Sequence, residues 1–417
     1  MMKIEKSIEA EGENAPLIKV LAGLIQGAYE RGASDLHFEP MEGYFRVRLR
    51  IDGVLQELQN LPPALHASLI SRLKIMSGTM DIAERRLPQD GRIRFQLRNH
   101  NKFLDLRVSV IPTLYGESAV IRLLDVSSLA LSLAELGFLD DDQEKFERII
   151  RSANGMVLIT GPTGSGKTTT LYACLQAINK SDQKLITVED PIEYQIAGIN
   201  QVQVQPAIGM TFPAALRSIL RQAPNILMIG EIRDYETAHI AIHASLTGHL
   251  IFSTLHTNDA TSAIARLIDI GIPSFLIAGS VRAIIAQRLV RRLCPSCKEP
   301  TSFSKYERRF LNVDFKSRDL RTSKSVVPMT AMGCSLCHGK GYQGRMGIFE
   351  ILILDDESRH LINQGASTLQ LRLHARKAGM RTLAEDGLEK IFAGWTTAQE
   401  VIASTLREEE YESAMDC

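Results

Sequence analysis

The sequence lacks any apolar run of about 18 residues, the length that a membrane-spanning helix needs. Residues 1–16 (MMKIEKSIEAEGENAP) are polar and acidic, so they also lack the apolar core of a signal peptide. We therefore expect a cytoplasmic protein with no direct membrane span. If the chain associates with a membrane, we expect it to do so through partner proteins.

The chain also lacks an excess of charge of either sign, because 48 Lys and Arg residues face 48 Asp and Glu residues. Aromatic residues are scarce at 6%, and there is a single tryptophan. A protein that binds nucleic acid usually carries a basic surface, often with aromatic side chains among the basic ones. The composition therefore argues against nucleic acid as a partner and leaves only local basic patches to consider.

Cysteine is rare, with six residues, but four of them form two CxxC pairs. In a reducing compartment such pairs are metal ligands before they are disulfides. Cys294, Cys297, Cys334 and Cys337 would supply four thiolates, which suits a closed tetrahedral Zn²⁺ site without an open position for catalysis. The alternative is four reduced cysteines that hold no metal.

At 417 residues the chain exceeds the usual size of a single core, so two or three domains are expected. Apolar residues at helical spacing cover residues 17–32. Phe45–Ile51 alternates apolar residues with arginines and ends at the turn pair Asp52-Gly53, which indicates a strand entering a hairpin. Residues 103–110 form a second alternating strand. From about residue 155 to 290, short apolar strands between amphipathic helices indicate a parallel sheet with helices on both faces.

The same patterns predict where the parts of the chain begin and end. The polar first residues read as a tail, and a stretch rich in Leu and Ser connects the two main domains. The expected segments are a flexible tail (1–16), an N-terminal α+β domain (17–126), a linker (127–140), a P-loop ATPase core (141–290), a tetracysteine zinc-binding module (291–347) and a C-terminal helical region (348–417).

The segment Gly161–Thr168 (GPTGSGKT) fits the pattern GxxxxGK[ST] between an apolar strand and a helix. Its backbone N–H groups can surround phosphate oxygens at the positive end of the helix dipole. Lys167 is expected to reach the β- and γ-phosphates, and the Thr168 hydroxyl to bind Mg²⁺. The expected nucleotide-binding residues are Gly161, Pro162, Thr163, Gly164, Ser165, Gly166, Lys167, Thr168 and Thr169.

Acidic residues follow two further apolar strands. Ile226–Ile229 ends in Gly230-Glu231, where a carboxylate can orient the water that attacks the γ-phosphate. The stretch LITVEDPIEY delivers Glu189, Asp190 and Glu193 after another strand, and these carboxylates suggest metal and water handling. The alternative is a solvated acidic turn.

Several motifs in one order resemble those of the secretion ATPases of type II secretion and type IV pilus assembly, of the GspE/PilB type. They are GASDLHFEP, RLPQDGRI, GPTGSGKTTTLY, ITVEDPIEY, GEIRD, TGHLIFSTLHTND, AQRLVRRLCPSC and GMRTLAEDGL, so the resemblance covers nearly the whole chain from about residue 17. It implies an α/β fold: a RecA-like P-loop ATPase domain, a smaller α+β (PAS-like) N-terminal domain and a tetracysteine zinc module. It also implies ATP with Mg²⁺ as the substrate, a homo-hexamer, and inner-membrane platform proteins as partners.

The resemblance assigns further roles by position. His249 and His256 lie in a motif like the family's His box, near the nucleotide, and Glu193 lies in one like its Asp box. Arg107 and Arg122 match family arginines that reach the phosphates from the N-terminal domain. The alternative is that these residues have no catalytic role: the histidines would lie at strand ends and the arginines on a polar strand face. Two further arginines, Arg217 and Arg221, are plausible site residues.

The chain departs from the family pattern in two respects. Ala223-Pro224-Asn225 stands where the family usually has Asp-Pro-Asp, which puts a subsidiary interaction in doubt. Many members also carry an additional N-terminal domain that docks on a membrane partner, so we expect this chain to be either a short form or a truncation.

The leading hypothesis is an ATP-hydrolysing hexameric motor that powers pilus or pseudopilus assembly and associates peripherally with the inner membrane through its partners. Retraction relatives lack the cysteine module, so its presence favours secretion or pilus extension. The rival is a nucleic-acid-stimulated translocase or DNA-uptake motor of the same P-loop class, for which the sequence offers no basic-aromatic channel. A non-hydrolysing scaffold is disfavoured because Lys167 and Glu231 are both present.

Overall fold

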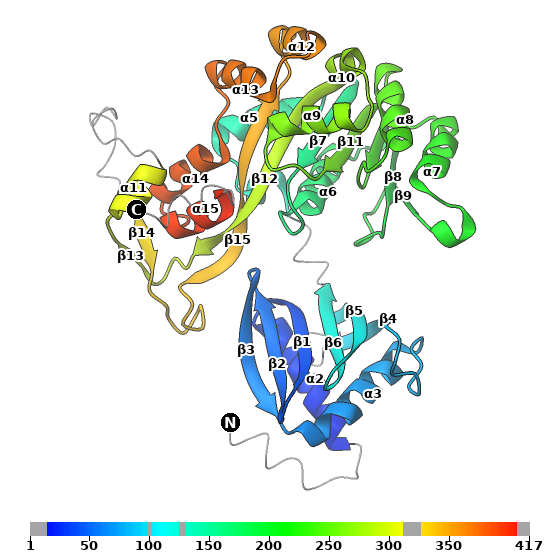
Figure 1. Ribbon diagram of the computed structural model, residues 1–417, viewed down its shortest axis with the longest axis vertical. Helices are drawn as coiled ribbons and strands as arrows, with labels where there is room; N and C mark the ends of the chain where they lie inside the picture. The colour runs from blue at the N-terminus through cyan, green and yellow to red at the C-terminus, as the bar shows by residue number, and fades with distance from the viewer. Residues whose placement is uncertain (1–14, 98–101, 125–130, 312–326, 407–417) are drawn as a thin grey trace. The chain divides into compact units, whose positions relative to one another are not determined.

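The computed structural model describes residues 15–97, 102–124, 131–311 and 327–406 (Figure 1). The chain divides into two compact units, Met1–Leu129 and Ala130–Cys417. Most of the expected flexible tail, and the first part of the expected linker, lie outside the described residues.

The N-terminal unit is built on a six-stranded antiparallel sheet with the order β3-β2-β1-β6-β5-β4. Its strands are β1 (Ala33–Met41), β2 (Tyr44–Ile51), β3 (Val54–Leu61), β4 (Gln89–Leu97), β5 (Lys102–Thr113) and β6 (Gly116–Leu124). Its helices are α2 (Ala15–Glu30), the 3₁₀ turn η1 (Pro63–Leu65) and α3 (His66–Ser77). The unit mixes helix and strand as expected, while its likeness to a PAS domain stays a prediction.

One face of this sheet packs against α2 and α3, and the other face carries charged side chains. Alternate residues such as Val47, Leu106 and Ile121 are buried in the core that the sheet shares with the two helices. The predicted hairpin is confirmed, since β2 pairs with β3 around Asp52 and Gly53. Both turn residues have positive φ, 51° and 87°, as a two-residue turn of this kind requires.

The second unit is built on a seven-stranded sheet with the order β15-β12-β7-β11-β10-β8-β9. All neighbours are parallel except β15, which runs antiparallel to β12, so the predicted α/β class is confirmed. The strands are β7 (Gly155–Thr160), β8 (Leu185–Glu189), β9 (Asn200–Gln203), β10 (Ile226–Ile229), β11 (Leu250–Leu255), β12 (Val281–Leu293) and β15 (Tyr342–Ile353). Every residue of β7, β8, β10 and β11 is buried, as in parallel strands covered on both faces.

Helices and short 3₁₀ turns precede, connect and follow these strands (Figure 1). They are η2 (Leu133–Leu136), α5 (Asp140–Ile149), α6 (Lys167–Ile178), η3 (Pro206–Ile208), α7 (Phe212–Ile219), η4 (Leu220–Gln222), α8 (Tyr235–Leu246), α9 (Ala260–Asp269), α10 (Ser274–Ser280), α11 (Lys305–Phe310), α12 (Asp356–Asn363), α13 (Thr368–Lys377), α14 (Leu383–Phe392) and α15 (Ala398–Thr405). No helix among the described residues has the length and apolar character to cross a membrane.

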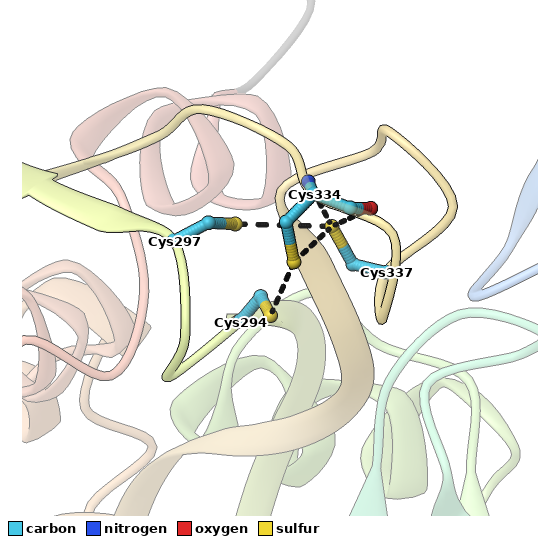
Figure 2. A group of neighbouring side chains, drawn as sticks. All are labelled: Cys294, Cys297, Cys334 and Cys337. Carbon is cyan, nitrogen blue, oxygen red and sulfur yellow. Dashed lines mark hydrogen bonds between the residues drawn. The ribbon is translucent and has the colours of Figure 1, made fainter.

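The four cysteines of the two CxxC motifs lie next to the end of the β12–β15 pair at which β12 ends and β15 begins (Figure 2). The small strands β13 (Lys298–Pro300) and β14 (Met329–Ala331) form a two-stranded sheet beside them. Because β15 returns along the whole length of β12, the segments around the cysteines belong to the same unit as the P-loop sheet. The expected segment boundaries after residues 290 and 347 therefore fall inside β12 and β15.

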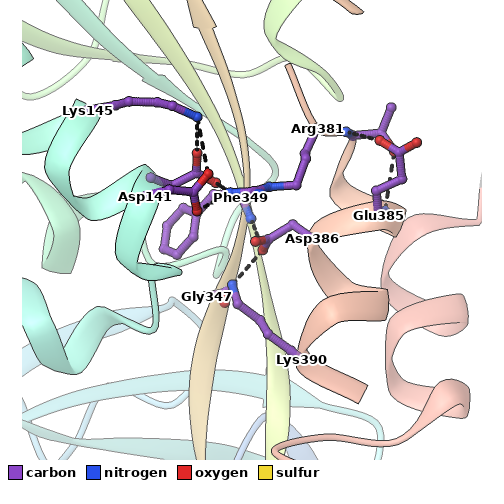
Figure 3. A network of polar contacts seen from close by, with 10 residues as sticks. Asp141, Lys145, Gly347, Phe349, Arg381, Glu385, Asp386 and Lys390 are labelled. Atoms are coloured by element: carbon purple, nitrogen blue, oxygen red, sulfur yellow. Dashed lines mark hydrogen bonds and ion pairs between the residues drawn. The ribbon is translucent and has the colours of Figure 1, made fainter. Parts of the chain in front are cut away.

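A buried ion pair fastens the C-terminal helices to this sheet (Figure 3). Asp386 and Lys390 on α14 are both fully buried and pair with each other. Lys390 Nζ also donates to the Gly347 carbonyl at 2.8 Å, and the Phe349 N–H donates to Asp386 Oδ2 at 2.9 Å. Burial raises the pKa of Asp386 and lowers the pKa of Lys390, while their mutual attraction opposes both shifts. The two charges are therefore stabilised by each other and by their hydrogen bonds to β15, and Asp142 adds to the attraction on Lys390.

Replacing Lys390 by Met should destabilise this unit strongly, because Asp386 would remain buried without its cation. Loss of one partner of a buried pair costs about 3–5 kcal/mol of unfolding free energy. Urea unfolding followed by the fluorescence of Trp395 would measure it. The matched control is Arg376→Ala, which breaks the exposed pair with Glu385 and should cost about 0.5 kcal/mol. Equal losses in the two variants would contradict this account.

Candidate active site

The P-loop connects the buried strand β7 to α6, in the order that the sequence predicts. Gly161, Gly164 and Gly166 have backbone φ angles of 151°, 81° and 88°, which residues other than glycine rarely adopt. A Cβ atom on Gly161 would lie 2.5 Å from the Gln287 carbonyl oxygen and 2.6 Å from Ser165 Oγ. The loop thus needs glycine both for its backbone turn and for its close approach to β12.

Lys167 begins α6 and is 9% exposed. Its Nζ donates to the carbonyl oxygens of Gly161 at 2.7 Å and Pro162 at 3.0 Å, so the lysine folds back on its own loop. Burial lowers the pKa of Lys167 to about 8; Glu231 partly offsets the shift and Arg288 adds to it. The ammonium group therefore has two carbonyl partners that phosphate oxygens would replace.

The other loop residues are open to a ligand. Pro162, Thr163, Gly164 and Thr168 are exposed, and Thr169 is half-buried. Ser165 Oγ is buried and has no hydrogen-bond partner among the described residues. A loop with an unpartnered hydroxyl, exposed residues and a helix N-terminus behind it fits the phosphates of a nucleotide. Thr168 is exposed in the first turn of α6.

Glu231 lies at the same edge of the sheet as the P-loop. The carboxyl ends of β7, β11 and β10 are aligned, with Thr160 opposite Leu255 and Ile229 opposite Ser253. Glu231 follows β10 and is half-buried, and its two oxygens pair with Arg233 at 2.5 Å and with His256 Nε2 at 3.4 Å. One edge thus holds the loop, a carboxylate and His256.

The acidic stretch after β8 divides into two environments. Glu189 is 3% exposed and accepts hydrogen bonds from the hydroxyls of Thr187, at 2.5 Å, and Tyr172. Burial and the Glu189 carboxylate raise the pKa of Tyr172. Glu189 is thus occupied by internal partners, whereas Asp190 is exposed and Glu193 half-buried. The expectation that all three carboxylates handle metal and water is corrected for Glu189.

His249 lies at the opposite edge of the sheet, which corrects the expectation that it lies near the nucleotide. It precedes β11, whose first residue, Leu250, is opposite the first residue of β7, Gly155. Its Nδ1 lies 2.9 Å from the Ala244 carbonyl oxygen. His249 and His256 flank one strand, and only the second reaches the edge that carries the P-loop, because the strand separates them by its full length.

Two residues that the sequence did not single out lie against the P-loop. Gln287 on β12 is 2% exposed, and its Oε1 accepts a hydrogen bond of 2.8 Å from Thr170 Oγ1 on α6. Arg288 is close enough to Lys167 to lower its pKa, and donates to the Asn258 carbonyl at 2.9 Å. The sequence signal that could have identified them is the polar pair Gln287-Arg288, which interrupts the largely apolar stretch VRAIIAQRLV.

Of the four arginines considered for the site, Arg107 and Arg122 lie in the N-terminal unit. They are directly opposite each other on β5 and β6, and both line a groove on the charged face of that sheet. Arg122 Nε donates to Asp35 Oδ1 at 3.0 Å. In the second unit, Arg217 pairs with Glu236, and Arg221 donates to the Arg217 carbonyl at 2.8 Å.

The departure at residues 223–225 has a local structural role. Asn225 Oδ1 accepts the Lys184 N–H at 2.8 Å, and the Asn225 N–H donates to the Lys184 carbonyl at 2.9 Å. These bonds align the start of β10 beside β8. Ala223 has a φ of 48°, a conformation that costs a residue other than glycine about 1–2 kcal/mol.

The four paired cysteines form a compact cluster with the geometry of a metal site (Figure 2). The Sγ–Sγ distances are 3.9 Å for Cys294–Cys334, 3.8 Å for Cys297–Cys337 and 3.8 Å for Cys334–Cys337. Four thiolates about 2.3 Å from a tetrahedral zinc ion would lie about 3.8 Å apart. Although burial opposes it, the backbone N–H groups of Cys334 and Gly341 lower the pKa of the Cys337 thiol to about 6. The residues therefore fit Zn²⁺.

Comparisons with known proteins show which family the sequence matches. Residues 10–403 match the family model described as Type II/IV secretion system protein. The type IV pilus assembly ATPase PilB of Myxococcus xanthus is 47% identical over 393 residues, which cover 94% of this chain and 68% of that protein. The type II secretion system ATPase E of Vibrio cholerae is 46% identical over 401 residues, which cover 96% of this chain and 77% of that protein.

Two solved structures share the fold. The pilus retraction motor PilT with bound ADP superposes with a TM-score of 0.60 at 25% identity, covering 94% of this chain and 98% of that one. The ATPase DotB of Legionella pneumophila gives a TM-score of 0.65 at 19% identity, covering 95% of this chain and 97% of that one. These proteins are ATPases or motors by name, and the shared architecture is that of a P-loop ATPase.

The purified chain should contain about one zinc ion, because four clustered thiolates form a closed tetrahedral site. Cys334→Ser should lower the zinc content severalfold, and Cys174→Ala, which removes a buried thiol of α6, should leave it unchanged. Elemental analysis after dialysis would measure both. A wild-type protein that is fully folded and free of zinc would contradict the assignment.

Nucleotide binding should weaken as pH rises above about 8, because Lys167 then loses its charge before the phosphates arrive. Bound phosphate favours the cationic form, so at a pH of about 8.5 binding should take up a proton. Calorimetry in two buffers of different ionisation enthalpy would detect this uptake. Lys167→Arg stays charged and should show none; the same uptake in that variant would assign the proton elsewhere.

Proposed function

Because this chain belongs to the Type II/IV secretion system protein family, we propose that it is an ATP-hydrolysing motor that powers pseudopilus or pilus assembly. The observation that carries this proposal is the shared edge at which the P-loop, Glu231 and His256 meet. A loop that holds phosphates beside a carboxylate that can orient water is the arrangement that ATP hydrolysis requires.

Residues of the second unit would have different roles at the nucleotide. Lys167 would exchange its two carbonyl partners for the β- and γ-phosphate oxygens, and the loop N–H groups would surround them. Thr168 would hold Mg²⁺, which supplies positive charge to the phosphates when it is bound. Glu231 would position the attacking water, with His256 and Arg233 fixing its two oxygens. Glu193, which is half-buried, is the second carboxylate that we propose for this task.

The N-terminal unit would contribute through its arginines. Arg107 and Arg122 are placed side by side on neighbouring strands, as a pair that neutralises a phosphoryl group would be. We infer that they assist hydrolysis, so that turnover depends on both units. Arg217 and Arg221 remain further candidates of the second unit.

The assembly would be a homo-hexamer bound to inner-membrane platform proteins, with a structural Zn²⁺ at the four cysteines. The names of the two relatives support secretion and pilus assembly equally, at 46% and 47% identity. Nothing in the described residues favours the rival nucleic-acid translocase. The cysteine cluster is the feature that favours secretion or pilus extension over retraction.

Lys167→Ala should lower ATP turnover by about 10²–10³-fold, as loss of a group that stabilises transferring charge does. Glu231→Gln should bind ATP but hydrolyse it about 10²–10⁴-fold more slowly, because the amide cannot act as a base. A phosphate-release assay and the binding of a fluorescent ATP analogue would separate the two effects. Lys180→Ala, an exposed lysine after the same helix, is the control. Wild-type turnover in Lys167→Ala would refute the proposed function.

A further inference from the structure

Two histidines lie one turn apart on the outer face of α8. His239 is half-buried and His243 is exposed, while Ala238 and Ile242 on the same helix are buried in the core of the second unit. Residues four apart on a helix are neighbours on one face. The Nε2 atoms of the two imidazoles lie 3.1 Å apart, and their ring centroids 4.3 Å apart. The helix therefore presents two imidazole nitrogens side by side at its surface.

The two imidazoles have only each other as hydrogen-bond partners within the described part of the chain. In that bond one Nε2 donates its proton to the lone pair of the other Nε2. A neutral imidazole can also carry its proton on Nδ1, and with both rings in that tautomer two nitrogen lone pairs face each other. A metal ion between the nitrogens satisfies both lone pairs, because neutral imidazole is a common metal ligand.

The separation of the two nitrogens fits a single bound ion. Imidazole nitrogens bind zinc at about 2.0–2.1 Å, so two of them 3.1 Å apart would subtend an angle of about 100° at the ion. That angle lies between about 90°, for square-planar or octahedral coordination, and about 109°, for tetrahedral coordination. Two histidines four residues apart on one helix are also the spacing that binds zinc in the H-E-x-x-H motif.

Aromatic contacts orient the first imidazole. The ring of Tyr235 lies 5.3 Å from the ring of His239, centroid to centroid, so three rings follow one another along α8. Tyr235 in turn lies over Gly271, since a Cβ atom on that glycine would be 3.4 Å from the ring. A ligand group that is already oriented loses less conformational freedom on binding. The pair is thus partly preorganised for a shared ion.

We propose that His239 and His243 bind one divalent transition-metal ion of the class that prefers imidazole, namely Cu²⁺, Ni²⁺ or Zn²⁺. This site goes beyond the proposed function and is separate from the four cysteines. No third His, Cys, Asp or Glu among the described residues joins the pair, and Glu236, one turn before His239, is paired with Arg217. Water therefore completes the coordination.

The chemistry of the pair is binding and not hydrolysis. In H-E-x-x-H the glutamate that follows the first histidine acts as the general base. Here Ile240 occupies that position, and it packs against the apolar core of the second unit. An ion held by the pair has no base beside it on the helix.

A matched pair on α12 should not hold such an ion. His360 and Gln364 are also exposed and four residues apart, with their Nε2 atoms 2.8 Å apart. An amide NH₂ only donates hydrogen bonds, and amide oxygens suit Mg²⁺ or Ca²⁺ better than imidazole-binding metals. Because the two pairs differ in the second imidazole, a comparison between them isolates its contribution.

Binding is tested by calorimetric titration of Ni²⁺ into the full-length, zinc-loaded chain at neutral pH without nucleotide. Wild type should bind one Ni²⁺ at this pair. His243→Gln should weaken that binding at least about ten-fold, because loss even of a group that only orients a metal ligand costs about 10–100-fold in affinity. His360→Gln should change it less than about two-fold.

Three results of that titration would overturn the site. They are wild type that binds no Ni²⁺, equal weakening by His243→Gln and His360→Gln, and Ni²⁺ uptake matched by release of zinc, which would place the ion at the cysteines. Elemental analysis of the titrated protein measures both metals and so separates the last result from the expected one.

A shared ion also predicts how the two substitutions combine. His239→Gln should weaken Ni²⁺ binding as much as His243→Gln does, and the double variant should lose little more than either single variant, because each alone leaves one imidazole. Gln364→His should create a second site of the same kind on α12. Losses that add in the double variant would mean that the histidines bind separate ions, and would overturn the proposal.

Discussion

The second unit depends on the placement of β7 between β12 and β11. All six residues of β7 are buried, and its register with both neighbours sets where the chain leaves the sheet. At that exit the loop passes so close to β12 that a Cβ on Gly161 would contact the Gln287 carbonyl. The side chain of Gln287 then bonds to Thr170 one turn into α6. The form of the phosphate loop is therefore determined by a neighbouring strand as much as by its own glycines.

The sequence correctly predicted those structural elements that depend on residues close together in the chain. The hairpin at Asp52-Gly53 follows from turn chemistry, and the strand before the P-loop follows from an unbroken apolar run between glycine-containing segments. The errors come from geometry over longer distances. His249 and His256 lie in one motif, and the resemblance implied that both lie near the nucleotide, but a parallel strand separates them by its whole length. Glu189 and Asp190 are adjacent, and only the first faces the interior, where Tyr172 and Thr187 bind it.

The cysteine cluster shows how pairing across the sheet creates a site from distant segments. Cys294 directly follows β12 and Cys337 precedes β15, and the antiparallel pairing of Leu293 with Tyr342 brings these ends together. The spacing of the CxxC pairs predicted the ligands, yet the boundaries drawn around them cut both strands, because that pairing could not be read from periodicity. The consequence is mechanical. A metal bound there would clamp one end of the strand pair whose middle, at Gln287, contacts the P-loop.

The equal count of acidic and basic residues conceals two opposite ways of handling charge. Asp386 and Lys390 are buried and neutralise each other, so their pair fastens α14 to β15 and leaves nothing for a ligand. The charged face of the N-terminal sheet instead carries a row of Arg50, Asp35, Arg122 and Arg107, one on each of β2, β1, β6 and β5, in which Asp35 pairs with both Arg122 and Arg50. Part of that row was within reach of the sequence, since Arg107 and Arg122 stand seven residues before and after the turn at Leu114-Tyr115. Residues equidistant from a tight hairpin turn are opposite each other. Joining Asp35 and Arg50 to the row required the pairing of β1 with β6, which connects segments more than 80 residues apart, and no local pattern contains it.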